Sequence, residues 1–206
     1  MSLKPVLVGL LATFLSVTAY AANLDSYDNE RFDVHWQVPK GWIKNDKLSN
    51  GLVGYSMPAS QAEAALKAFV MDEASPSING LVESMAVAFY DGWEVVATRS
   101  ATSKELATSG AASQYRVLYR KKFLTEDFSV ERLLVLEHYF LYKQNAYILT
   151  LAVPQKEWAN LSSDLQSLLD HFCLGNRKNQ NHFQNDLTPD VGLKNEMSRM
   201  DKKSEY

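Results

Sequence analysis

Residues 130–142 constrain the fold more than any other segment of this chain, because they are apolar on both faces of an extended strand. A strand of this kind must be covered on both sides and is typical of the centre of a sheet. Residues 147–153 alternate along their length, and only the polar residues 143–146 separate the two segments. The pattern therefore predicts an antiparallel hairpin at the centre of a sheet.

Residues 32–38 and 115–120 alternate and predict further strands, and so do the short run at residues 52–56 and the segment 93–98. Residues 59–70 leave two interpretations open, because their composition favours a helix while residues 65–71 alternate like a strand. We favour the strand, since two strands before the first helix would complete the sheet.

Two segments match the period of an amphipathic helix. Residues 78–89 place large apolar side chains at spacings of three and four, after a Ser-Pro-Ser sequence and before Asp-Gly. Residues 154–172 form a second apolar stripe that stops before Gly175. Together with the strands they predict an α+β domain, an antiparallel sheet flanked by helices.

The two ends of the chain differ in composition from the middle. Residues 1–21 combine Lys4, a short apolar stretch and Ala19-Tyr20-Ala21, the pattern of a signal peptide cleaved after Ala21. The apolar stretch is shorter than the ~20 residues that span a bilayer, so we expect no integral span after cleavage. Residues 30–174 form the predicted domain, and the polar residues 175–206 are expected to be disordered.

Charge and cysteine content exclude several classes of protein. The 21 Lys and Arg against 24 Asp and Glu give a net charge of −3, which disfavours nucleic-acid binding. Cys173 is the one cysteine, so the chain has no internal disulfide and no thiolate-rich metal site. We expect Cys173 to pack as a small apolar side chain; pairing between chains or a reactive thiol are the alternatives.

Conventional catalytic and metal motifs are missing from the sequence. The residues around Ser56 approach a nucleophile elbow, but Pro58 replaces its final small residue. Glu137 and His138 are neighbours in a strand and so point to opposite faces. We expect no metal and no cofactor, because zinc-ligand spacing is absent from the four histidines, His35, His138, His171 and His182.

Aromatic crowding supplies the candidate ligand-binding residues. We place them between the sheet and the first predicted helix, at Trp42, Tyr55, Tyr90 and Trp93. Packing in the core is the competing interpretation for the tryptophans.

The order of these elements resembles the PsbP-like family, which includes a Ran-GTPase-release factor and DcrB-type bacterial proteins. The first strand and turn carry the likeness with Phe32-x-Val34-x-Trp36-x-Val38-Pro39-x-Gly41-Trp42. The predicted last hairpin adds Asn145-Ala146-Tyr147-Ile148-Leu149-Thr150, and Pro154 and Trp158 then lead toward Phe172. The resemblance implies a sandwich whose members serve as accessory or binding proteins, and none of their functional motifs matches a residue here.

The sequence as a whole favours an exported, non-enzymatic binding or accessory protein of the cell envelope, periplasmic or secreted. Its partner would be a protein or a small ligand. One alternative is an envelope hydrolase whose Ser, His and acid meet only in the fold, with Ser56 and His138 as its candidates. Another is a secreted effector or host-interaction factor that uses residues 175–206 for recognition.

Overall fold

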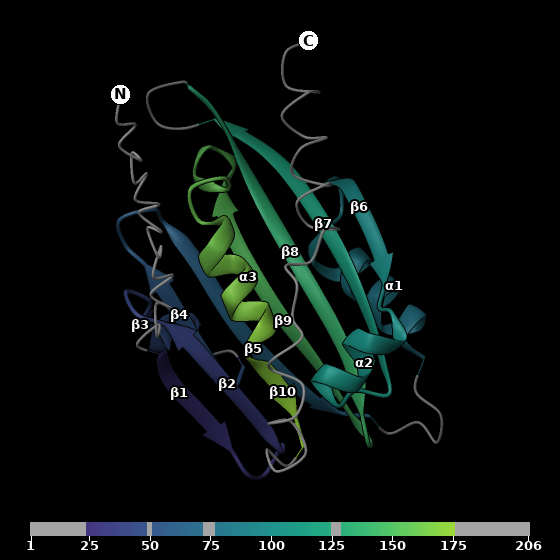
Figure 1. Ribbon diagram of the computed structural model, residues 1–206. Coiled ribbons are helices and arrows are strands. Elements are labelled where there is room, and N and C mark those ends of the chain that lie inside the picture. Colours follow the sequence, from purple (N-terminus) through teal and green to yellow (C-terminus); the bar gives the residue numbers. More distant parts are fainter. Residues whose placement is uncertain (1–23, 49–50, 72–76, 125–128, 176–206) are drawn as a thin grey trace, which may run out of the picture.

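The computed structural model describes residues 24–48, 51–71, 77–124 and 129–175, which form two antiparallel sheets (Figure 1). The large sheet has the order β3-β4-β5-β9-β8-β7-β6 and the small sheet the order β1-β2-β10. Large-sheet strands are β3 Ile43–Lys44, β4 Val53–Met57, β5 Ala62–Val70, β6 Glu94–Ser100, β7 Ser113–Leu124, β8 Val130–Tyr142 and β9 Asn145–Pro154. Small-sheet strands are β1 Leu24–Asn29, β2 Val34–Pro39 and β10 Phe172–Leu174.

Helices lie on both faces of the large sheet. The helical elements are η1 Asp46–Leu48, α1 Ile78–Phe89, α2 Ser103–Ser109, η2 Gln155–Glu157 and α3 Ser162–Asp170. Helix α3 and the small sheet pack on one face, and α1 packs on the other (Figure 1). This arrangement confirms the predicted antiparallel sheet flanked by helices.

The predicted central hairpin is β8–β9, in which Tyr142 pairs with Asn145 across the turn. β8 lies between β7 and β9, and β9 lies between β8 and β5, so both strands are interior. The open choice at residues 59–70 resolves as strand β5. Its Ala64 and Leu66 are fully buried against the α3 face, a burial pattern of period two that a helix would not produce.

The main core lies between the large sheet, the small sheet and α3. Trp36 of β2 is fully buried there, and its Nε1 donates a hydrogen bond to the Leu168 carbonyl oxygen of α3 at 2.9 Å. Leu165, Leu168 and Leu169 of α3 are all buried in the same core. The small sheet and α3 are thereby fixed to each other and to the large sheet.

The prediction of a second helix over residues 154–172 is only partly confirmed. Residues 155–157 form a short 3-10 turn, and α3 begins at Ser162. The apolar stripe continues past the end of α3 because Phe172 and Leu174 belong to β10, which pairs with β2 and points the same side chains into the same core. A helical stripe and the buried face of a following strand look alike in sequence when the two are contiguous.

Helix α2 and strand β1 were not predicted. In α2, Thr102 and Glu105 form a capping box, and Gly110 ends the helix with φ 75°. A Cβ at Gly110 would lie 2.3 Å from the Leu174 carbonyl oxygen, so glycine is required by space as well as by φ. β1 lies ahead of residue 30, where the predicted domain began, and pairs along the whole of β2.

The predicted signal peptide and nearly all of the polar tail, residues 176–206, lie outside the described residues. Among the helices of the described residues, none has the length and apolar character needed to cross a membrane.

Candidate functional site

Helix α1 covers its face of the sheet unusually loosely. Ile78, Leu81, Val82 and Met85 pack against the sheet, yet no α1 residue is fully buried. Asn79, Glu83 and Ser84 occupy exposed positions in the first part of the helix, whereas Val87 near its end is 80% exposed. The first part of the exposed side of α1 is thus polar, as in an ordinary surface helix, and exposed apolar side chains are confined to its C-terminal turn.

Phe89 extends this exposed apolar surface from α1 toward strand β5. Phe89 is 59% exposed and the Nζ of Lys67 lies 5.4 Å from its ring centroid. Phe69, two residues after Lys67 in β5 and therefore on the same face, is 41% exposed. We call Phe69, Val87 and Phe89 together the α1 surface.

A buried carboxylate fastens the end of α1 to the sheet. Glu137 of β8 is 2% exposed and accepts hydrogen bonds from the hydroxyls of Tyr90 at 2.5 Å, Thr150 at 3.1 Å and Tyr139. Tyr90 is the residue that ends α1. Burial and the nearby Glu137 carboxylate raise the pKa of both tyrosines well above the usual value, so their hydroxyls stay protonated as donors.

Aromatic rings reinforce this attachment. Tyr90 stacks on Tyr119 with ring centroids 4.1 Å apart, and Trp93 meets Tyr90 edge-on at 5.3 Å. The Nζ of Lys121 lies 5.1 Å from the centroid of the Trp93 ring. The C-terminal end of α1 is thus held by hydrogen bonds and ring contacts, while its outer side stays open.

A second polar cluster lies on the opposite face, under α2. The buried His138 has its Nε2 2.9 Å from Gln114 Oε1 and 3.3 Å from Arg116 Nε. Glu105 of α2 pairs with Arg99 and, at 3.3 Å, with Arg116. Burial lowers the pKa of His138 far below the usual value, and Arg116 and Arg99 lower it further. This neutral imidazole is enclosed, and its partners Gln114 and Arg116 in turn contact Glu105 of α2.

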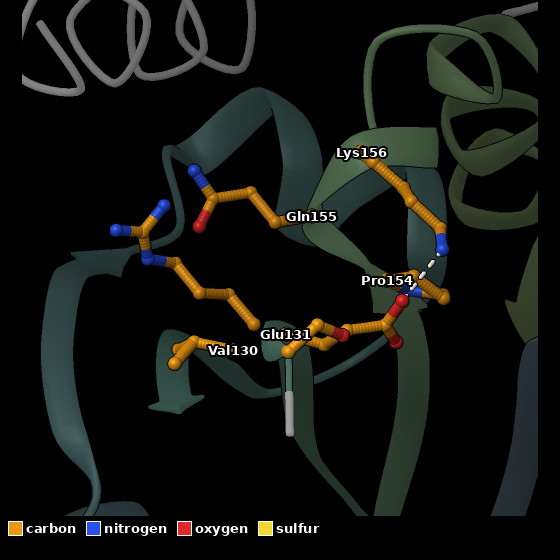
Figure 2. Close-up of a pocket in the computed structure, with 7 residues that line it drawn as sticks. Val130, Glu131, Pro154, Gln155 and Lys156 are labelled. Carbon is orange, nitrogen blue, oxygen red and sulfur yellow. Dashed lines mark hydrogen bonds and ion pairs between the residues drawn. The ribbon is translucent and has the colours of Figure 1, made fainter. Parts of the chain in front are cut away.

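The far end of the β7–β8 hairpin exposes other apolar side chains, Phe123, Leu124 and Val130. Figure 2 shows the cavity beside it, of about 480 Å³, where Glu131 and Lys156 form an ion pair at 2.7 Å. Ser129, Val130, Arg132, Pro154 and Gln155 complete its lining. Because the lining carries both acidic and basic side chains, the cavity favours neither an anionic nor a cationic ligand.

The structure brings two of the four candidate ligand-binding residues together. Tyr90 and Trp93 meet beside α1, as expected. Trp42 and Tyr55 lie on the other face, in the core with Trp36, whose ring is 5.4 Å from that of Tyr55. Tyr55 alternates with Gly54 and Ser56 in β4, and this alternation turns its ring away from α1. A ligand-binding role for the four residues stays a prediction.

The hydrolase candidates are kept apart by the sheet. Ser56 faces the α1 side, because its neighbour Tyr55 faces the main core, whereas His138 stacks on Phe140 of that core. The two side chains therefore cannot serve each other as nucleophile and base. Among the residues that the structure describes, no group of three or more His, Cys, Asp and Glu has the geometry of a metal site.

Sequence reasoning missed Glu137 as a functional residue. The signal was present: an acid in the middle of a strand that is otherwise apolar on both faces must be paired or hydrogen-bonded when buried. What the sequence did not reveal is that Tyr90, far from Glu137 along the chain, supplies one of the donors.

No protein-family model and no curated protein sequence matches this chain. Among solved structures, cyanobacterial PsbP (CyanoP) from Synechocystis sp. PCC 6803 is similar at a TM-score of 0.56 and 14% identity, over 76% of this chain and 95% of that one. The Saccharomyces cerevisiae Ran-binding protein Mog1p is similar at a TM-score of 0.48 and 10% identity, over 77% of this chain and 99% of that one. LpqN, involved in cell envelope biogenesis of Mycobacterium tuberculosis, is similar at a TM-score of 0.47 and 10% identity, over 76% of this chain and 88% of that one. The likeness to the cyanobacterial protein establishes that this chain has the PsbP-like fold.

Proposed function

We propose that this protein is an exported, non-enzymatic accessory protein of the cell envelope that binds a protein partner through the α1 surface. The observation that carries the proposal is that the C-terminal turn of α1 leaves two large apolar side chains, Val87 and Phe89, exposed. Apolar surface of this kind marks sites of protein interaction when it gathers on one face. Fold likeness alone does not assign a function, so the proposal depends on this surface.

The geometry of the α1 surface favours a protein over a small ligand. The apolar side chains stand on a convex helix and on strand β5, whose Lys67 lies over the Phe89 ring. Small molecules bind in concave sites that surround most of their surface. A partner that buries Val87 and Phe89 would need an apolar groove, as partners of amphipathic helices have.

Export is the second part of the proposal, and it rests on the pattern of residues 1–21. Cell fractionation followed by N-terminal sequencing tests it. The protein in the periplasmic or extracellular fraction is expected to begin at Ala22. A full-length chain that remains in the cytosol would contradict export and leave the binding surface to be tested separately.

Site-specific photocrosslinking in the producing cells tests the binding surface. A photoreactive residue at Val87 is expected to give one discrete adduct of higher mass. The same residue at Val130, 62% exposed on the hairpin end, is the matched control and is expected to give none. An adduct at Val130 but none at Val87 would contradict the assignment of the partner surface to α1.

The specificity of that adduct is checked by a substitution on the same surface. Phe89→Ser is expected to abolish the adduct at Val87, because Phe89 is the other large apolar side chain that this end of α1 leaves exposed. Leu124→Ser, a matched change of another exposed apolar residue at 66% exposure, is expected to leave it unchanged. An adduct insensitive to Phe89→Ser would show that the crosslink reports chance contact.

A further inference from the structure

One lysine lies among the exposed apolar side chains of the α1 surface. Lys67 of β5 is half-buried and pairs with Ile148 of β9, which is fully buried on the α1 side of the sheet. Residues directly opposite in neighbouring strands share a face, so Lys67 points to the α1 side. Its head group lies over the Phe89 ring, and Phe69 follows it on the same face. A partner that covers Phe69 and Phe89 therefore also covers Lys67.

The side chain of Lys67 is held at both of its ends. A Cβ added at Gly51 would lie 2.7 Å from the Cγ of Lys67, so the chain at Gly51 runs directly against the lysine stem. At the other end, the Nζ lies 5.4 Å from the centroid of the Phe89 ring. A cation placed in this way is preorganised, because little side-chain entropy is lost when a partner binds it.

The chain places no counter-charge beside this cation. Across the part of the sequence that the structure describes, the partner of Lys67 is the Phe89 ring, and no carboxylate lies at ion-pair distance from its Nζ. Lys143, by contrast, pairs with Asp33 at 2.8 Å. Glu63, the one acid of β5, is four residues away along the strand, roughly 14 Å by the rise of a strand. The ammonium of Lys67 thus depends on water and the ring for its stabilisation.

We infer that the partner of the α1 surface carries a carboxylate, flanked by apolar side chains, that pairs with Lys67. This inference rests on the proposed function, because a protein that covers Phe69 and Phe89 encloses the ammonium as well. Enclosing an unpaired charge is costly, whereas a charge that is paired and hydrogen-bonded can be buried. The partner must therefore supply the carboxylate that the described residues do not place beside Lys67.

The charge pair gives the surface selectivity that apolar contact alone does not have. Val87 and Phe89 can contact any apolar groove of suitable shape. A carboxylate opposite Lys67 fixes the register of the partner on the surface. A groove that lacks the acid at this point is disfavoured, since it would leave the lysine enclosed and unpaired.

The experiment measures, in the producing cells, the adduct formed by a photoreactive residue at Val87 in chains substituted at Lys67. Lys67→Gln removes the charge and is expected to lower the yield of the adduct by about tenfold or more, because loss of one member of a buried charge pair strongly weakens binding. Lys67→Arg keeps the charge and is expected to retain more of the adduct than Lys67→Gln. Lys121→Gln, a matched change of the lysine over the Trp93 ring, is expected to leave the yield unchanged.

A carbodiimide reaction tests the same contact in the wild-type chain. The adduct is purified in its folded state and treated with a water-soluble carbodiimide, which joins a lysine amine to a carboxylate in direct contact. Mass spectrometry is expected to find Lys67 linked to the partner. The linked residue distinguishes a side-chain carboxylate of Asp or Glu from a terminal carboxylate, and either link supports the inference.

The outcomes separate this inference from the proposed function. A wild-type chain without an adduct at Val87 would overturn the proposed function and this inference with it. A normal adduct yield in Lys67→Gln, at the melting temperature of wild type, would overturn the inference alone. So would a wild-type adduct in which the carbodiimide links other lysines to the partner and never Lys67. This second measurement decides the matter if Lys67→Gln does not fold.

Discussion

The two faces of the large sheet are covered in different ways. On one face α3 buries three leucines in a core that also contains Trp36 and the small sheet. On the other face α1 buries no residue and is fastened at its end by Tyr90 and Glu137. Burial of apolar area supplies most of the stability of a fold. The α3 face therefore contributes more of the stability, and the α1 face leaves large apolar side chains exposed.

The largest expected difference is between matched leucines in the two helices. Leu168→Ala in α3 is expected to destabilise the protein by about 2–5 kcal/mol, because Leu168 is fully buried and its loss leaves a cavity. Leu81→Ala in α1 is expected to cost less, about 1–2 kcal/mol, since Leu81 is only half-buried. Urea unfolding measures both, and equal losses would contradict the contrast between the faces.

Alkaline pH is expected to lower the free energy of unfolding through Tyr90 and Tyr139, which lie on the α1 face of the large sheet. The pKa of Tyr90 and of Tyr139 is raised, first by burial and then by the Glu137 carboxylate. Below about pH 10 both folded and unfolded chains keep these protons; above it, the unfolded chain loses protons that the folded chain retains. The free energy of unfolding then falls by about 1.4 kcal/mol per pH unit for each tyrosine.

Tyr90→Phe isolates one of these contributions. The variant is expected to lose less stability than wild type per pH unit above about pH 10, when unfolding by urea is measured across this range. An unchanged slope would mean that Tyr90 ionises as readily in the folded protein as in the unfolded chain.

Acidic pH is expected to lower the free energy of unfolding through His138, which lies on the α3 face of the large sheet. His138 has a pKa well below the ordinary 6.5, because of burial and of Arg116 and Arg99. As the pH falls below about 6.5, the unfolded chain binds a proton that the folded protein does not, and stability drops by up to about 1.4 kcal/mol per pH unit. His138→Gln is expected to flatten this part of the profile. The same slope in variant and wild type would refute the assignment.

The smallest expected effect on stability is at the α1 surface. Val87→Ser is expected to change the free energy of unfolding by no more than about 0.5 kcal/mol, because Val87 is 80% exposed. The same substitution is expected to weaken partner binding. A large loss of stability would show that Val87 packs within the protein itself.

Periodic segments were predictable from the sequence, and short or polar ones were not. The β8–β9 hairpin and α1 follow from long repeating patterns. β10 spans three residues and continues the apolar stripe of α3, so the pattern predicted one helix. β1 is polar on its exposed face, and its position depends on pairing with β2.

The sites required contacts between distant segments. Tyr90 and Trp93 are close in sequence and were placed together correctly, while the alternation of β4 carries Tyr55 to the other face. Lys67 and Phe89 meet only through the placement of α1 on the sheet. Nothing in the local sequence fixes that placement, so their contact emerged from the structure.

Native-state amide hydrogen exchange tests the contrast between the two faces most directly. We predict that the amides of α3 exchange only with the free energy of global unfolding, while those of α1 exchange through local opening at a lower free energy. Equal protection of α1 and α3 would contradict the central claim, because α1 would then be held as firmly as the core.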